Sequence, residues 1–253
     1  MPRKERYQES GHYHIINRGV EQRSIYLEPE DYEFFLDLLL KLTREYDIVM
    51  HAFCLMTNHY HLLLETKQNN LSKAIQFVND KYSKYFNKKY KRSGHLWQGR
   101  YKSYPLFDDA HFWIAAKYIE RNPIKAGMIK DVALYKYQSF FQWKYKHDYF
   151  SLLENSKIFD MTYDEYANYV NSEMEIDAID VVYKSPKLII KADGKLKVLS
   201  KRLETFFELD RDINRDENIK KAYEYGYTKS EIADFLHMSH TAISKIIKTV
   251  LNL

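Results

Sequence analysis

Three short runs in the first half of the chain are rich in β-branched and aromatic residues, and they predict strands. The first covers residues 12–17. The next two, 48–55 and 59–65, are separated by a short connection whose last residue is Asn58. A short polar connection containing Asn between two such runs predicts a β-hairpin.

Apolar residues at helical spacing follow the first and the third of these runs. Pro29 suits the first turn of a helix, and apolar side chains recur every three or four positions after it. A second helix is predicted from about Asn70 to about Tyr90, because its apolar residues form one continuous face.

A third helix is predicted beyond an aromatic, basic segment that leads into a fourth strand. Asp108 or Asp109 can cap its first turn. We expect it to end near Asn122, because Pro123 disfavours a helical conformation in the residue before it. The order β-α-β-β-α-β followed by a helix predicts an α+β fold, with helices packed on one ferredoxin-like antiparallel sheet.

The rest of the chain differs in character from this α+β segment. We expect one domain over residues 1–140, a helical extension with a Lys-rich connector over 141–200, and an all-α tail over 201–253. In the tail, Thr228 and Glu231 have the spacing of a capping box, and apolar positions on both sides of a short turn predict two successive helices.

Composition narrows the class of protein further. The net charge of +4 is compatible with a nucleic-acid partner, and the 23 Tyr, 14 Phe and 3 Trp offer flat side chains that can stack on unpaired bases or fill the core. The single cysteine, Cys54, excludes an intrachain disulfide and suits a reducing compartment. Without a secretory h-region or an apolar stretch of membrane-spanning length, we expect a cytoplasmic protein that does not enter membranes and that associates with the nucleoid when bound to DNA.

Two histidines in the third strand-like run are candidates for metal binding. Residues i and i+2 of a strand point to the same face, so His59 and His61 project together. Two imidazoles placed in this way can bind one divalent ion and leave positions open for a substrate oxygen. Two histidines on an ordinary strand face are the alternative, and His12 and His14 have the same spacing.

A tyrosine on the third predicted helix is a candidate nucleophile. Tyr118 precedes Asn122 by one helical turn, so both side chains lie on the same face. A phenol with a pKa of about 10 is a poor nucleophile at neutral pH, and a cation that withdraws charge from a target phosphate eases its attack. Alternatively, Tyr118 is a core aromatic residue and Asn122 only ends the helix.

Cationic and aromatic residues gather at two further places that could contact nucleic acid through phosphate binding or base stacking, although a solvated charged strand with a buried Trp has the same composition. The candidate residues are Arg18, Arg23, Trp97, Arg100, Tyr101 and Lys102.

Four segments in this order resemble the REP-associated tyrosine transposases, a branch of the single-tyrosine HUH transposases. They are GHYHIINRGVEQRSIY, MTNHYHLLLE, GHLWQGRYKS and KYIERNPIKAGM, and they cover roughly residues 10–140. Each segment alone is a loose match, but four in the correct order and spacing form a specific signal.

The resemblance implies a role for four residues. His59 and His61 would be metal ligands and Tyr118 the nucleophile. Asn122 stands where relatives carry a polar residue that completes the metal site, although Asn is shorter than the Gln that some of them have. Such proteins bind Mg²⁺ or Mn²⁺ and cleave single-stranded DNA near an imperfect hairpin. They form a 5′-phosphotyrosine and release a 3′-OH that can rejoin strands without ATP.

The tail resembles a helix-turn-helix that reads duplex DNA. Its second helix would present a polar and basic face to the DNA, formed by His240, Thr241, Ser244, Lys245 and Lys248. A helical pair docked on the first domain, or a dimer contact, is the alternative.

Two other functions are compatible with the sequence. One is a domesticated DNA-binding regulator that has lost transposition, although the His59, His61, Tyr118 and Asn122 set is intact. The other is a metal-dependent RNA-processing nuclease on the same scaffold, which would need a general base. Glu65 and Glu120 are the candidates for that base.

Overall fold

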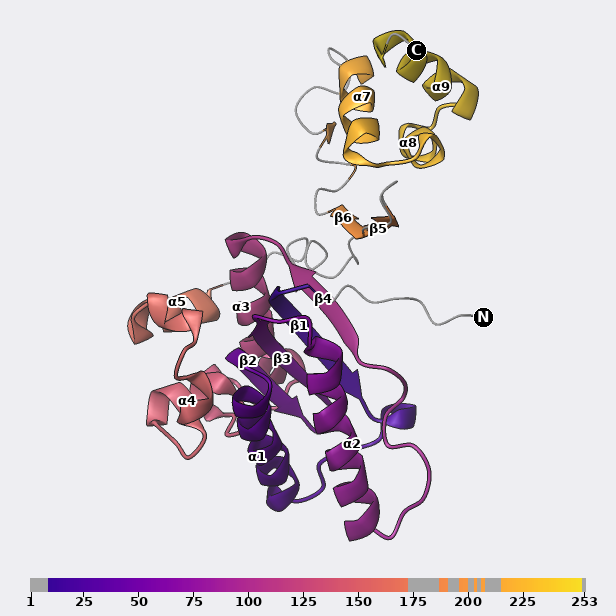
Figure 1. Cartoon of the computed structure of the whole chain (residues 1–253). Coiled ribbons are helices and arrows are strands. Elements are labelled where there is room, and N and C mark those ends of the chain that lie inside the picture. Colours follow the sequence, from indigo (N-terminus) through magenta and orange to yellow (C-terminus); the bar gives the residue numbers. More distant parts are fainter. Residues whose placement is uncertain are drawn as a thin grey trace. The chain divides into compact units, whose positions relative to one another are not determined.

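A computed structural model describes residues 9–172, 187–190, 196–199, 203, 206–207 and 215–251 of the chain (Figure 1). Contacts between residues divide the protein into two compact units, residues 1–185 and residues 186–253. The first unit carries the α+β fold, and the second carries the C-terminal helices.

The first unit is built on one antiparallel sheet of four strands. These are β1 (Gly11–Arg18), β2 (Ile48–Met56), β3 (His59–Thr66) and β4 (Lys102–Leu106), arranged in the order β2-β3-β1-β4. This order interleaves the strands of the two β-α-β units, with β1 and β3 in the centre, as in a ferredoxin-like fold. The predicted fold class, including the hairpin formed by β2 and β3, is therefore confirmed.

Helices cover both faces of this sheet. Helices α1 (Pro29–Glu45) and α2 (Leu71–Lys89) pack side by side on one face, and α3 (Asp109–Lys125) covers the other (Figure 1). Strand alternation sorts the side chains of β3 accordingly, because Leu62 belongs to the core under α1 and α2 whereas Leu63 belongs to the core under α3. The odd-numbered residues of β3, which include both candidate metal ligands, therefore face α3.

The predicted end of the third helix was wrong by about one turn. Helix α3 continues through Pro123 to Lys125, and the backbone N–H of Ala126 still donates to the carbonyl of Asn122 at 2.9 Å. A proline in the last turn removes only one hydrogen bond of the helix, so the helix can pass through it. The predicted cap is confirmed, because the Asp108 side chain accepts from the N–H of His111.

The segment after α3 packs into the first unit. It contains three short 3-10 helices, η2 (Val132–Leu134), η3 (Phe150–Leu153) and η4 (Lys157–Asp160), and the helices α4 (Ser139–Tyr145) and α5 (Tyr163–Asn171). Apolar residues of this segment join the core under α1 and α2; they include Phe140, Leu152, Leu153, Ile158, Tyr166 and Val170. The helical extension is thus an integral layer of this unit, while most of the predicted Lys-rich connector lies outside the described residues.

A buried carboxyl group links α3 to this extension. Glu120 is fully buried and accepts hydrogen bonds from the Ser139 hydroxyl at 2.6 Å and from the backbone N–H of Phe140 at 3.1 Å. Burial raises the pKa of Glu120 to about 8, although these hydrogen bonds act in the opposite direction.

The contribution of Glu120 to the stability of the protein should therefore fall as the pH rises. A group whose pKa is higher in the folded state contributes stability that is complete below its unfolded pKa and is lost as the pH rises through its folded pKa. For Glu120 that window extends from about 4.5 to about 8, and the loss is up to about 5 kcal/mol. The buried histidines contribute with the opposite sign below pH 6.5, so the test is the difference between two urea-unfolding profiles: the stability of wild type relative to Glu120→Gln should decline across this range. Identical profiles would contradict the assignment.

The second unit has a small core of its own. It contains the strand pair β5 (Lys187–Ile190) and β6 (Leu196–Leu199) and the helices α7 (Arg215–Tyr225), α8 (Lys229–Leu236) and α9 (His240–Leu251). The helices are held together by buried residues that include Phe207, Ile219, Ile232, Ile243 and Ile247. None of the helices in the described ranges combines the length and the apolar character needed to cross a membrane.

The predicted start of α8 and the predicted turn after it are both present. Thr228 and Glu231 form the expected capping box. His237 ends α8 in the left-handed conformation with φ of 51°, and α9 begins at His240. The Ser239 hydroxyl accepts from the N–H of Ala242 and so caps the first turn of α9.

Candidate functional site

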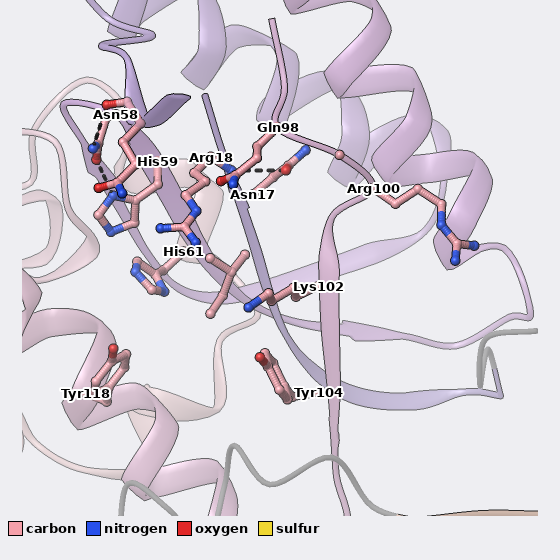
Figure 2. Close-up of a pocket in the computed structure, with 13 residues that line it drawn as sticks. Asn17, Arg18, Asn58, His59, His61, Gln98, Arg100, Lys102, Tyr104 and Tyr118 are labelled. Carbon is pink, nitrogen blue, oxygen red and sulfur yellow. Dashed lines mark hydrogen bonds between the residues drawn. The ribbon is translucent and has the colours of Figure 1, made fainter. Parts of the chain in front are cut away.

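A pocket of about 440 Å³ lies at the end of the sheet on the side that α3 covers (Figure 2). It is lined by Ile16, Asn17, Arg18, Gln22, Asn58, His59, His61, Gln98, Gly99, Arg100, Lys102, Tyr104 and Tyr118. We call it the histidine–tyrosine pocket. Three of the residues lining it are cationic and none is acidic, so it favours an anionic ligand.

The structure brings three of the predicted site residues together in this pocket. His59 and His61 project from the same face of β3, with ring centroids 4.9 Å apart. Tyr118 reaches them from α3, and its ring centroid lies 5.7 Å from that of His61 (Figure 2). Residues 57 positions apart in the sequence thus meet because α3 crosses the end of β3 at this point.

Both histidines of the pocket are held in the neutral form. Burial, together with the charge of Arg18, lowers the pKa of His59 to about 4. Burial lowers the pKa of His61 well below its usual value, and the neighbouring His14 and His59 add to this effect. Neutral imidazole is the form that can bind a metal ion.

The hydroxyl of Tyr118 is protonated at neutral pH. Burial raises its pKa, and a hydrogen bond with the Asn122 side chain acts in the opposite direction. The Asn122 amide also donates to the backbone carbonyl of Tyr118 at 2.9 Å. Asn122 is buried and does not line the pocket, so its role as a third metal ligand stays a prediction.

The donor atoms of the pocket fit a divalent cation. Within the described part of the chain, the Nε2 atom of His61 is buried and has no hydrogen-bond partner. A buried polar atom without a partner is costly, and a bound cation would satisfy it. Two imidazoles leave most coordination positions of Mg²⁺ or Mn²⁺ to oxygen ligands, which water and the phosphate of a substrate would supply.

The structure places the four predicted cationic contacts with nucleic acid differently. Arg18 and Lys102 are exposed and lie at the pocket, whereas Arg100, which also lines it, points away from the histidines (Figure 2). Arg23 does not line the pocket and pairs with Glu21 at 3.4 Å.

The two aromatic candidates have structural contacts. The indole N–H of Trp97 donates to the Asn79 carbonyl at 3.1 Å, and its ring packs against Tyr60. The hydroxyl of the buried Tyr101 lies 3.1 Å from that of Ser72. Neither aromatic residue lines the pocket, so the structure favours the alternative in which they support the fold.

The sequence analysis missed three residues at or beside the pocket. Asn58 lies 2.6 Å from His59, His14 lies 2.9 Å from His61, and Tyr104 lines the pocket opposite Tyr118 (Figure 2). For His14 and Tyr104 the signal is strand register, because they pair directly across β1 and β4, whereas Asn58 lies in the connection between β2 and β3. Which strand lies next to which is not contained in any local pattern, so this signal appears only once the sheet order is known.

Helix α9 presents the predicted polar face in the second unit. His240, Thr241, Lys245 and Lys248 are exposed. Ser244 is half-buried, and its hydroxyl accepts from the Lys229 ammonium group at 3.3 Å. The buried residues of α9, which include Ile243 and Ile247, lie on the opposite face. The exposed face is therefore basic.

Comparison with known proteins finds sequence similarity within the first unit. Residues 7–122 match the family model described as IS200-like transposase. A REP-associated tyrosine transposase of Haemophilus influenzae is 34% identical over 101 residues, which cover 35% of this chain and 57% of the relative. The chain thus spans little more than half of the length of that relative.

Two solved structures match part of the chain. One is a REP-associated tyrosine transposase bound to a REP hairpin, with 19% identity, a TM-score of 0.49, and coverage of 56% of this chain and 84% of the other. The second is a transposase from Deinococcus radiodurans, with 19% identity, a TM-score of 0.34, and coverage of 48% and 97%.

Proposed function

We propose that this protein nicks single-stranded DNA and transfers the strand through Tyr118, and the match of residues 7–122 to the family model described as IS200-like transposase supports this proposal. One observation carries the proposal: a tyrosine and two neutral histidines share a pocket lined by cationic side chains and by no carboxylate. This combination suits attack of a phenol on a phosphodiester.

The reaction is an exchange of one phosphodiester for another. The phenolic oxygen of Tyr118 attacks the scissile phosphorus and gives up its proton. The bond from phosphorus to the 3′ oxygen breaks, and that oxygen takes up a proton to become a free 3′-OH. The 5′ side of the cut stays attached as a phosphotyrosine. Attack of a 3′-OH on this linkage reverses the step, so strands can be rejoined without ATP.

The residues of the pocket have different proposed roles in this reaction. His59 and His61 would hold a divalent cation, Mg²⁺ or Mn²⁺, with Asn122 as a proposed third ligand; the cation would neutralise charge on the scissile phosphate. Arg18 and Lys102 hold the flanking phosphates by charge. The partly buried Tyr118 is fixed between α3 and the sheet, which orients its oxygen and limits the access of water.

The proposed substrate is single-stranded DNA next to an imperfect hairpin, as the resemblance to REP-associated transposases implies. The dimensions of the site agree with this choice, because Tyr118 lies inside a pocket of about 440 Å³ and a single flexible strand can enter it. A duplex would have to separate its strands first, which costs energy at every base step.

A hydrolytic RNA nuclease has less support. Such an enzyme needs a general base at the scissile bond. Glu120 is fully buried in contact with Ser139 and Phe140, and Glu65 does not line the pocket. Neither of the two candidate bases is therefore placed to act on a substrate bound next to Tyr118.

Capture of a covalent product tests the proposed reaction. The full chain would be incubated with Mg²⁺ or Mn²⁺ and labelled single-stranded hairpins with varied flanks, and the products separated on a denaturing gel. We expect a DNA-linked protein band that EDTA abolishes. Binding without this band across the whole pool would favour the domesticated regulator, and cleavage without it would favour the hydrolytic nuclease.

Removing positive charge at the pocket should weaken binding of single-stranded DNA. We expect Arg18→Ala and Lys102→Ala each to lower the affinity and to reduce the slope of log K against log salt by about 0.7, the value for one single-strand phosphate contact. Fluorescence anisotropy at several salt concentrations measures this slope. Lys84→Ala, an exposed charge on α2 outside the pocket, is the matched control. Equal slopes in all three variants would rule out phosphate contacts at the pocket.

We also propose that α9 binds duplex DNA. Its exposed face carries Lys245 and Lys248 together with His240 and Thr241, and it follows α8 after a tight turn as a recognition helix does. Changing both lysines to Ala should weaken duplex binding at least about tenfold while leaving the covalent product on single-stranded hairpins intact. Unchanged duplex binding would instead leave α9 as a packing or dimer surface.

A further inference from the structure

The hydrogen bonds of Asn58 determine which nitrogen of His59 carries the proton. The amide nitrogen of Asn58 donates to the Gln22 carbonyl at 3.0 Å, so its amide oxygen faces the Nδ1 atom of His59 at 2.6 Å (Figure 2). An amide oxygen only accepts hydrogen bonds. The proton of neutral His59 must therefore be on Nδ1, which leaves the lone pair on Nε2.

A second contact orients the ring of His61. Its Nδ1 atom lies 2.9 Å from the Nε2 atom of His14, and the two rings are stacked with centroids 5.1 Å apart. His14 is fully buried on β1. Either ring can donate in this contact, and the direction that serves metal binding is the one in which the Nδ1–H of His61 donates to His14, because it leaves the lone pair of His61 on the buried Nε2 atom.

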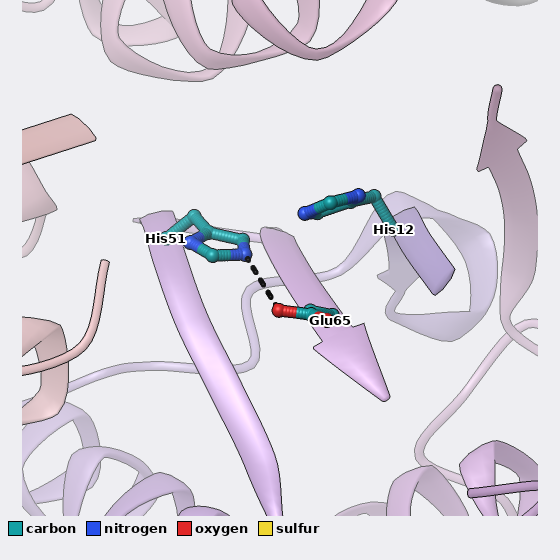
Figure 3. A group of neighbouring side chains, drawn as sticks. All are labelled: His12, His51 and Glu65. Atoms are coloured by element: carbon teal, nitrogen blue, oxygen red, sulfur yellow. Dashed lines mark ion pairs between the residues drawn. The ribbon is translucent and has the colours of Figure 1, made fainter. Parts of the chain in front are cut away.

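A nearby group of potential ligands shows the opposite arrangement. His12, His51 and Glu65 have donor atoms within 4.8 Å of one another, on the same face of the sheet (Figure 3). The backbone N–H of Lys157, however, donates to the Nδ1 atom of His51 at 3.0 Å. Neutral His51 therefore carries its proton on Nε2, the atom that faces Glu65 at 3.9 Å. A protonated ring nitrogen cannot bind a metal ion, so this group lacks the lone pair that the histidine–tyrosine pocket provides.

We propose that Asn58 and His14 are positioning residues that hold His59 and His61 in the Nδ1–H tautomer, so that both Nε2 atoms are available to one divalent cation. Free imidazole exchanges between its two tautomers, and fixing one of them in advance removes that cost from metal binding. The inference rests on the proposed function, because it assumes that the two histidines are the metal ligands.

Mn²⁺ binding and histidine NMR together test this role. The affinity of the full chain for Mn²⁺ would be measured from the EPR signal of the free ion. Asn58→Leu keeps the approximate volume and removes the acceptor, and we expect it to bind Mn²⁺ about 10–100-fold more weakly. Asn58→Asp restores an acceptor and should recover most of the affinity. His14→Leu and His14→Gln form the corresponding pair for His61.

The tautomers can be read directly. Long-range ¹H–¹⁵N spectra of histidine-labelled protein without metal should show the proton of His59 on Nδ1 in wild type and a mixture of tautomers in Asn58→Leu. Glu65→Gln is the control for the other histidine group, and it should leave the affinity for Mn²⁺ unchanged.

The outcomes separate this inference from the proposed function. If Asn58→Leu and His14→Leu bind Mn²⁺ as wild type does while the double change His59→Ala, His61→Ala does not, the positioning role is wrong and the metal site stands. If Asn58→Asp loses as much affinity as Asn58→Leu, the residue acts through packing and the positioning role is also wrong. Wild-type binding by the double variant would remove the metal site itself.

Discussion

Replacing Tyr118 with Phe should abolish the covalent DNA–protein product while leaving the fold, Mn²⁺ binding and single-stranded DNA affinity close to wild type. The change removes one oxygen atom, and the ring can keep its edge contacts with His14 and His61, whose centroids lie 6.1 and 5.7 Å away. Without the phenolic oxygen the scissile phosphate has no protein nucleophile. We therefore expect no detectable covalent product.

Tyr104→Phe is the matched control for this experiment. Tyr104 lines the same pocket from β4 and its hydroxyl pKa is raised by burial, as that of Tyr118 is (Figure 2). We expect Tyr104→Phe to retain the covalent band. A band that survives in Tyr118→Phe and disappears in Tyr104→Phe would show that Tyr104 on β4 is the nucleophile. Loss in both variants would show that the pocket needs both hydroxyls.

Local sequence patterns were sufficient for most of the elements of the fold. The apolar face between Asn70 and Tyr90 predicted α2, and Asp108 and the pair Thr228 and Glu231 marked the starts of α3 and α8. These features depend on residues within one or two turns of each other, and their hydrogen bonds close locally. Pro123 was misjudged because the penalty of a proline depends on its position within a helix, and that position depends on packing beyond it.

The functional pocket could be predicted only in part, for a related reason. His59 and His61 are two residues apart, so strand alternation alone places them together. Their supporting contacts come from His14 on β1 and from Asn58, whose amide is oriented by the carbonyl of Gln22. These contacts depend on strand order and on a loop conformation, which no periodicity encodes. Trp97 is a case in which local composition misled. The basic and aromatic segment around it suggested contact with DNA, but its indole N–H donates a hydrogen bond within the fold.

The His-Tyr-His motif occurs twice in the sequence, and the fold gives its two copies different surroundings. His12 and His14 on β1 have the same spacing as His59 and His61 on β3, and all four face the α3 side of the sheet. β1 and β3 are antiparallel neighbours, which places His14 next to His61 and His12 opposite Glu65. One copy of the motif thus lines the pocket, while the other contributes a support at His14 and a separate group at His12.

The double change His59→Ala, His61→Ala should remove metal-dependent cleavage while leaving the protein folded. Neutralisation of the scissile phosphate by a bound cation contributes several kcal/mol to such a reaction, so cleavage should fall on the order of 10³-fold or more. Denaturing gels at a fixed Mn²⁺ concentration measure this loss, and thermal unfolding serves as the control for folding. Cleavage by the double variant at the wild-type rate would show that His59 and His61 do not hold the cation that the reaction needs.

The pH dependence of Mn²⁺ binding tests whether the two ligand histidines are buried and neutral. Protons compete with the metal ion for imidazole, and an ordinary histidine with a pKa near 6.5 would lose about tenfold in affinity at pH 5.5. Burial and the charge of Arg18 lower the pKa of His59 to about 4, and burial beside His14 and His59 lowers the pKa of His61 well below its ordinary value. Wild type should therefore bind Mn²⁺ almost equally at pH 7.5 and pH 5.5 and lose it only as the pH approaches 4. A binding midpoint near pH 6.5 would mean that the ligand histidines are exposed to water, and the neutral, buried pair on which the proposed chemistry depends would have to be abandoned.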